Sequence, residues 1–289
     1  MIAIVSYISI GSYDANTVNE DEILSSILSE LEFDHEIVPW SDPTINWGKY
    51  STLLIKSTWD YFDYYPEFLK WIEKIKNLNI KVLNGVETLL WNSSKNYLSE
   101  IKEKGYPVIS GQQLNKGTEV EFELIKEAVK SDTWVLKPLV SGGAKNTLKI
   151  ESAKWSEFSQ KVQDLVNQED FLLQPFIQEV QEIGEYSLIF FNAEFSHAVL
   201  KTPAKGDFRV QHYFGGEIKV IEPSTKMINA AKSIIEDFAP NSLYTRVDGV
   251  EIEGEFHLME LELIEPYLFL SSHQDAISNY KNALKKRLN

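Results

Sequence analysis

The sequence predicts an α/β fold in its N-terminal part and mixed α+β structure in the remainder. Up to about residue 88, short apolar strands alternate with amphipathic helical patterns, which is typical of a small parallel layer. Farther along, strands follow one another more closely, and the last two form a hairpin pattern. Apolar residues make up 43% and charged residues 25% of the 289 residues, so the chain can bury a large core.

The elements of the N-terminal layer follow from the spacing of apolar residues. Asn19 or Asp21 can cap a helix that runs to about Leu31, and Pro66 opens a second helix. Short apolar runs predict strands at 1–7, 35–38, 53–56 and 80–83. We therefore expect a parallel layer with helices between its strands.

Two further blocks are predicted after this layer. Ser93 or Ser94 can cap a helix to Lys104, and Gly105 can end it. The first block also contains predicted strands at 107–110, 133–137, 147–150 and 171–174, and helices at 119–130 and 155–166. The second contains strands at 185–191, 194–201, 243–252 and 255–264, helices at 224–238 and before the basic tail 285–287, and loop glycines at 206, 215, 216 and 254.

Charge and composition exclude several classes of protein. The formal charge is −15, and the first 48 residues hold nine acidic side chains and no Lys or Arg. A surface of this sign repels phosphates, which excludes a general nucleic-acid or anionic-membrane binder but leaves room for a small basic pocket. The lack of Cys excludes disulfides and thiolate metal sites. Without a targeting signal or a spanning apolar run, the expectation is a cytoplasmic protein.

A glycine loop follows the strand that ends at Lys137. Its sequence is Ser141-Gly142-Gly143-Ala144-Lys145. Small residues let backbone N–H groups approach phosphate oxygens, and a nearby Lys adds positive charge. Taken alone, the loop favours a plain hairpin turn, because Gly-Gly is common in turns.

A stiff apolar connector follows the strand at 171–174. Gln174, Phe176 and Ile177 surround Pro175, which has no N–H to donate. Such a connector can hold a planar base and offer the N–H of Phe176 or Ile177 to its edge. The alternative is a simple linker between two packed layers.

Acidic residues interrupt the apolar face of the last two strands. Glu260 and Glu262 have the same parity on one strand, and Asp248 can lie across from them. Buried carboxylates need a counter-charge, and a hard cation such as Mg²⁺ supplies one through oxygen ligands. An exposed acidic strand face is the alternative. Arg209 and Arg246, two of only three Arg in the chain, lie in these same regions.

Taken in order, these features resemble the ATP-grasp superfamily, with a glutathione synthetase-like ATP lobe, over nearly the whole chain. The resemblance implies an N-terminal pre-ATP-grasp domain at 1–88, a lid lobe at 89–176 and a C-terminal lobe with the metal site at 177–289. The segments STWDYFDYYPEFLKWI, EFSHAVLKTPAKGDFRVQ and MELELIEPYLFL are similar to the D-cycloserine ligase branch, in which ATP closes a ureido-serine onto itself. Two departures are Glu262, where many relatives have Asn, and Ile264-Glu265-Pro266-Tyr267 in place of a Pro-Gly turn.

The resemblance also implies roles for individual residues. ATP would be bound by Lys95, Lys137, Ser141, Gly142, Gly143, Gln174, Phe176, Ile177 and Glu185, with Glu179 as a second choice for the ribose. Mg²⁺, or Mn²⁺ in its place, would be bound by Asp248, Glu260 and Glu262. Arg246, Arg209 and Lys201 would be catalytic, although Lys201 could also be a solvated strand end.

The predicted function is therefore an ADP-forming carboxylate–amine ligase or cyclo-ligase that acts through an acyl phosphate. Ser57, Trp59 and Asp60 follow a strand of the parallel layer, where open α/β sheets bind ligands, and Arg209 is a further candidate for substrate contact. Trp59 could equally be a core aromatic. The alternatives are a non-catalytic nucleotide-binding regulatory protein and an ATP-grasp kinase. The expected partner is an amino-acid-like small molecule, and the oligomeric state is open, with a homodimer considered.

Overall fold

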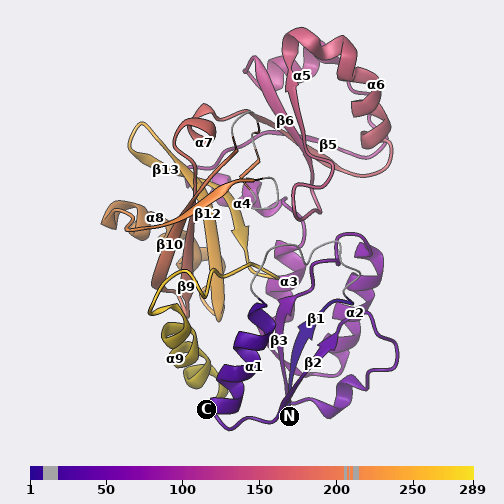
Figure 1. The fold of residues 1–289 in the computed structure, drawn as a ribbon. Helices are drawn as coiled ribbons and strands as arrows, with labels where there is room; N and C mark the ends of the chain where they lie inside the picture. Colours follow the sequence, from indigo (N-terminus) through magenta and orange to yellow (C-terminus); the bar gives the residue numbers. More distant parts are fainter. Residues whose placement is uncertain (9–18, 205–206, 208, 211–214) are drawn as a thin grey trace.

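The computed structural model describes residues 1–8, 19–204, 207, 209–210 and 215–289. These residues form three sheets, which follow one another along the chain and are separated in space (Figure 1). The predicted segments 1–88, 89–176 and 177–289 contain one sheet each. The combination of a parallel α/β layer with antiparallel α+β sheets agrees with the fold class predicted from the sequence.

The N-terminal sheet is parallel, as predicted. Its strands are β1 (Ile2–Ser6), β2 (His35–Pro39), β3 (Thr52–Ser57) and β4 (Lys81–Leu83), in the order β2-β1-β3-β4. The helical elements are α1 (Glu20–Glu30), the 3₁₀ turn η1 (Trp47–Lys49), α2 (Tyr65–Asn77) and α3 (Val86–Asn92). Asn19 caps α1, because its side chain accepts hydrogen bonds from the backbone N–H groups of Asp21 and Glu22.

The central sheet is antiparallel. Its strands are β5 (Gln112–Leu114), β6 (Thr133–Pro138), β7 (Leu148–Glu151) and β8 (Phe171–Pro175), in the order β5-β8-β6-β7. The helical elements of this part are α4 (Tyr97–Glu103), α5 (Phe122–Ala128), the 3₁₀ turn η2 (Ser152–Lys154) and α6 (Trp155–Val166). The glycine loop connects β6 to β7, so it is a hairpin connection as well as a candidate phosphate loop.

The C-terminal sheet is antiparallel and has the order β11-β10-β9-β12-β13. Its strands are β9 (Glu185–Phe191), β10 (Glu194–Thr202), β11 (Glu217–Ile221), β12 (Tyr244–Ile252) and β13 (Glu255–Glu262). The helices are α7 (Gln178–Glu182), α8 (Thr225–Phe238) and α9 (Ala276–Leu288). The predicted hairpin around Gly254 is confirmed, since this glycine turns with φ 77° between β12 and β13.

Several short elements differ from the prediction. The helix expected from Ser93 or Ser94 begins only at Tyr97, and α3 precedes it. The strand expected at 107–110 is a single bridge between Val108 and Leu258, while β5 begins at Gln112. α7 and β11 were not predicted. Elements this short depend on tertiary partners rather than on their own periodicity. Gly206 lies outside the described residues.

Contacts between distant segments join the N-terminal and C-terminal sheets. Asn84 donates to the carbonyls of Tyr244 and Leu263 at 2.9 and 2.8 Å and accepts from the N–H of Leu243 at 2.7 Å. α9 lies beside α1 in Figure 1. Lys281 of α9 pairs with Glu30 of α1 at 2.6 Å. Over the described ranges, no helix has the length and apolarity needed to cross a bilayer.

Candidate active site

A cavity of about 990 Å³ lies where the three sheets meet. The glycine loop, β6, the β8–α7 connector, the strands of the C-terminal sheet and the segment 264–269 all contribute to its wall. Trp59, Tyr61 and Phe62, which follow β3, reach it from the N-terminal side. Candidate residues that are far apart in the sequence therefore face one space.

Lys95 and Lys137 line the cavity beside the glycine loop. Lys95 Nζ donates to the carbonyl and hydroxyl of Ser141 at 3.0 and 3.1 Å, and pairs with Glu260 at 3.1 Å. Lys95 thus links the loop to β13. Burial lowers the pKa of Lys137, which forms no ion pair or side-chain hydrogen bond within the described residues. An anion in the cavity would satisfy this ammonium.

The glycine loop lies against the N-terminal sheet's side of the cavity. A Cβ on Gly142 would overlap Cε1 of Phe62 and would come within 3.0 and 3.2 Å of two other ring carbons. Lys145 forms an ion pair with Asp63. Gly143 has a φ of 59°, which favours glycine. Close packing against Phe62 therefore explains why the loop requires a residue without a side chain.

The β8–α7 connector forms an apolar part of the wall, as predicted. Gln174 donates to the carbonyl of Ile109, and the N–H of Phe176 donates to Thr133 at 2.8 Å. Phe176 therefore does not have a free N–H for a base, and Ile177 is the remaining candidate donor. Glu185 faces the cavity, whereas Glu179 is outside its lining.

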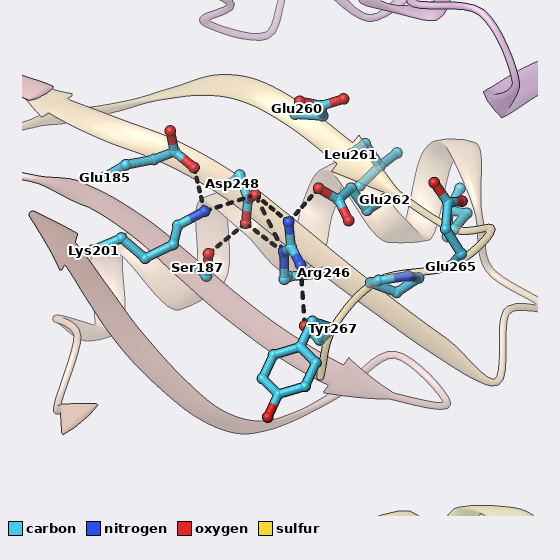
Figure 2. Close-up of polar contacts among 12 residues, drawn as sticks. Glu185, Ser187, Lys201, Arg246, Asp248, Glu260, Leu261, Glu262, Glu265 and Tyr267 are labelled. Carbon is cyan, nitrogen blue, oxygen red and sulfur yellow. Dashed lines mark hydrogen bonds and ion pairs between the residues drawn. The ribbon is translucent and has the colours of Figure 1, made fainter. Parts of the chain in front are cut away.

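A charged network occupies the adjoining strands (Figure 2). Arg246 donates to Asp248 through Nε and Nη2 at 3.0 and 2.9 Å, and its Nη2 also pairs with Glu262. Lys201 pairs with Glu185 and with Asp248, the latter at 3.1 Å. The interpretation of Lys201 as a solvated strand end is wrong, because its side chain is only 9% exposed.

The strand register explains this geometry. Asp248 lies opposite Glu260, and Arg246 lies opposite Glu262. Burial acts to raise the pKa of Asp248, but Arg246 and Lys201 outweigh it and hold this pKa below its ordinary value. Burial raises the pKa of Glu262 to about 7 despite the neighbouring guanidinium. Asp248 is therefore buried and compensated, whereas Glu262 is partly buried and still lacks sufficient positive charge.

The prediction that these acids need a counter-charge is confirmed, but Lys and Arg side chains of the protein supply most of that charge. Within the described part of the chain, no three His, Asp or Glu side chains converge as a ready metal site. The oxygens of Asp248 accept from Ser187 as well as from Arg246 and Lys201. Glu260 and Glu262 face the cavity, and their carboxylate oxygens suit a hard divalent cation. Among the described residues, Glu260 and Glu262 each pair with a single protein cation and fit the metal through their remaining oxygens, whereas Asp248 already accepts from three protein side chains.

The predicted substrate contacts on the N-terminal side divide into two groups. Trp59 lines the cavity, and its Nε1 donates to the carbonyl of Glu265 at 3.0 Å. Ser57 donates to Asp21 at 2.6 Å, and Asp60 accepts from Trp40 at 2.6 Å. Both side chains are buried outside the cavity lining, so Ser57 and Asp60 support the fold around Trp59 and do not reach the cavity.

Arg209 and Glu265 are also charged residues of the lining. Arg209 donates to both carboxylate oxygens of Asp207, at 3.0 and 2.7 Å. Glu265, which was predicted only to replace part of a Pro-Gly turn, is an unpredicted member of the site. Its position three residues after Glu262 was the available signal.

Comparisons with known proteins agree with this architecture. Residues 117–269 match the family model described as prokaryotic glutathione synthetase, ATP-grasp domain. Residues 2–84 match the N-terminal domain of D-cycloserine synthetase DcsG. The cycloserine biosynthesis protein DcsG of Streptomyces lavendulae is 24% identical over 266 residues, which are 88% of each protein.

Solved structures share the fold over the whole chain. The crystal structure of D-cycloserine synthetase DcsG has a TM-score of 0.85 and 22% identity, covering 100% of this chain and 99% of that one. D-alanine–D-alanine ligase from Bacillus anthracis, complexed with ATP, has a TM-score of 0.65 and 15% identity, with coverage of 98% and 94%. Because the glutathione synthetase model spans more than half of the sequence, the chain belongs to this ATP-grasp family and is an ADP-forming ATP-grasp ligase.

Proposed function

We propose that the chain joins a carboxylate to an amine, in one molecule or between two, on a small amino-acid-like substrate. One observation carries the proposal: a single cavity brings Lys95, Lys137 and Lys201 together with Glu260 and Glu262. Phosphoryl transfer depends mainly on positioning and on neutralising phosphate charge, and these side chains provide both.

The nucleotide would lie between the central and C-terminal sheets. Its base would occupy the apolar wall at Gln174, Phe176 and Ile177, with the N–H of Ile177 as the donor to the base edge. The ribose would lie near Glu185, which faces the cavity, and Glu179 is the weaker alternative. The phosphates would extend toward Ser141, Gly142, Gly143, Lys95 and Lys137.

Mg²⁺, with Mn²⁺ as a substitute, would be held by Glu260 and Glu262 together with phosphate oxygens. Asp248 is the predicted third ligand, and it would have to exchange a hydrogen bond from Arg246 or Lys201 for the metal. When bound, a divalent cation lowers the negative charge on the phosphates.

The reaction would have two steps. A carboxylate oxygen of the substrate attacks the γ-phosphorus, the bond to the leaving oxygen of ADP breaks, and an acyl phosphate forms. The lone pair of an amine nitrogen then attacks the acyl carbon, the bond to phosphate breaks, and the nitrogen loses a proton as the amide forms. Lys137 and Lys201 would offset the moving negative charge.

Arg246 and Arg209 would act in the second step. Arg246 is positioned by Asp248 and Glu262, so its guanidinium can stabilise the tetrahedral oxyanion without reorganising. Arg209 would bind the acyl phosphate. The glycine loop, closed against Phe62, would keep water away from the acyl phosphate.

The substrate would contact Trp59 and Arg209. The similarity to proteins named for cycloserine synthesis makes ureido-serine the first compound to test. The acidity of the chain argues against nucleic-acid and membrane partners. A homodimer remains a proposal that a sizing measurement would decide.

The test is phosphate release from Mg-ATP with ureido-serine, alanine and serine, each in both enantiomers. We expect at least one compound to stimulate release, and mass spectrometry to find a new amide. Glu255→Gln, an exposed change elsewhere on β13, is the matched control and should keep full activity. Tight ATP binding without stimulated release would favour the regulatory protein, and a stable phosphorylated product would favour the kinase.

A further inference from the structure

The charged side chains that line the cavity are almost all paired. Lys95 pairs with Glu260, Lys201 with Glu185 and Asp248, and Arg246 with Asp248 and Glu262. Arg209 pairs with Asp207, and Glu217 pairs with Lys219. Lys137 and Glu265 are the two exceptions among the lining residues that the structure describes.

The two unpaired charges have opposite signs. Lys137 lies on β6 beside the glycine loop, where the proposed function places the phosphates. Glu265 comes from the segment after β13 and lies beside Trp59, which follows β3, in the cavity lining. In Figure 2 the Glu265 carboxylate lies apart from the network around Arg246, and no dashed line reaches it.

The backbone around Glu265 is fixed although its carboxylate is unpaired. The carbonyls of Glu265, Pro266 and Tyr267 accept hydrogen bonds from Trp59, Lys56 and Arg246, each at 3.0 Å. The buried side chain of Glu20 accepts from the N–H groups of Leu268 and Leu270 in the same segment, at 2.8 and 2.9 Å. The backbone of Glu265 therefore has a defined place in the cavity wall, from which its side chain extends.

The surroundings of Glu265 favour a cation from outside the chain. Trp59, Tyr61 and Tyr267 line the same cavity, and aromatic faces attract ammonium groups. A half-buried carboxylate without a partner is costly, and a charged hydrogen-bond donor removes this cost. A divalent metal has better ligands in Glu260 and Glu262, so an organic ammonium is the better match for a single carboxylate.

We propose that Glu265 binds the ammonium group of the substrate, which makes the substrate class amino acids that carry a free, protonated amine. This inference rests on the proposed function, because that function places a small amino-acid-like molecule in the cavity. Glu265 would hold the ammonium end near the aromatic rings, and the substrate carboxylate would point toward the phosphate side at Lys137. Glu265 is thus a residue that determines specificity, and it takes no part in bond formation.

The test measures equilibrium binding without turnover. Calorimetry with the full chain and ADP would compare ureido-serine, alanine and serine with their analogues that lack the amino group. For any amino acid that binds, Glu265→Gln should weaken binding by about 10-fold to 100-fold, the effect of losing a charge-assisted hydrogen bond. The amine-free analogue should bind the wild type and the variant equally. Glu255→Gln should leave all these affinities unchanged.

Three outcomes would overturn the inference. In the first, amino acids bind the wild type and Glu265→Gln with equal affinity. In the second, the substitution weakens binding of the amine-free analogues as much as it weakens binding of the amino acids. In the third, no amino acid in the panel binds the wild type. The melting temperature distinguishes substrate binding from a merely structural role, because Glu265→Gln should not lower it. Amino-acid binding that depends on Glu265, without stimulated phosphate release, would support this subsite and reject the proposed function.

Discussion

Glu265→Gln is expected to stabilise the protein at high pH, although it removes a charge from the active-site wall. Burial first, and then repulsion from Glu262, raises the pKa of Glu265 to about 8 from an ordinary 4.5. The folded chain therefore holds a proton there that the unfolded chain releases between these two values. The contribution of Glu265 to the free energy of unfolding is fully present below about pH 4.5 and is lost as the pH rises through about 8.

The size of the effect follows from the same pKa difference. At about 1.36 kcal/mol for each pKa unit, the upper limit is about 5 kcal/mol. The side chain is only half-buried, so solvent screening should reduce the effect to about 1–3 kcal/mol. That corresponds to a higher melting temperature by about 2–8 °C for a chain of this size. The variant should match the wild type near pH 4.5 and exceed it above pH 8.

Differential scanning fluorimetry at several pH values between 4.5 and 9 provides the measurement. Other titrating groups are present in both proteins and cancel in the difference, except Glu262, whose repulsion by Glu265 is removed as well and adds to the gain at high pH. Glu255→Gln is the control, and its difference from the wild type should be small at every pH. A Glu265→Gln variant that is equally stable or less stable above pH 8 would refute the reasoning that this carboxylate is half-buried without a partner.

Three further variants test other parts of the account. Glu260→Gln should lower substrate-stimulated phosphate release by about 100-fold or more without unfolding the protein, and full activity would reject its role in metal binding. Gly142→Ala should raise the KM for ATP because the new methyl overlaps Phe62, and Phe62→Ala should restore it; no rise in KM would contradict the loop geometry. Asn84→Ala should cost about 2–4 kcal/mol in urea unfolding, since it leaves three buried backbone groups unpaired, and a loss below about 0.5 kcal/mol would contradict that accounting.

The fold was predictable where apolar periodicity was strong. The alternation before residue 88 predicted the parallel layer, and the parity of Glu260 and Glu262 placed both acids on one strand face. The register then confirmed Asp248 opposite Glu260. Short elements such as α7 and β11 lacked this signal, because a few residues can adopt either structure until a neighbouring strand pairs with them.

The sequence predicted which residues belong to the candidate site, but not which of them form ion pairs and hydrogen bonds with one another. The sequence indicated that the buried acids need counter-charges, yet only the structure shows Arg246 and Lys201 in that role. Ser57 was expected at the site because it lies at a strand's carboxyl end, but its hydroxyl bonds to Asp21. Side-chain direction in a loop after a strand depends on packing that a linear pattern does not encode.

The central claim is that the cavity performs ATP-dependent amide formation on an amino-acid-like substrate. The most direct measurement follows ADP, phosphate and organic product together during a reaction of the wild-type protein with Mg-ATP and the substrate panel. The account predicts that a stimulating compound yields ADP, phosphate and an amide in equal amounts. ATP hydrolysis that no compound stimulates, or a product that retains the phosphoryl group, would contradict it.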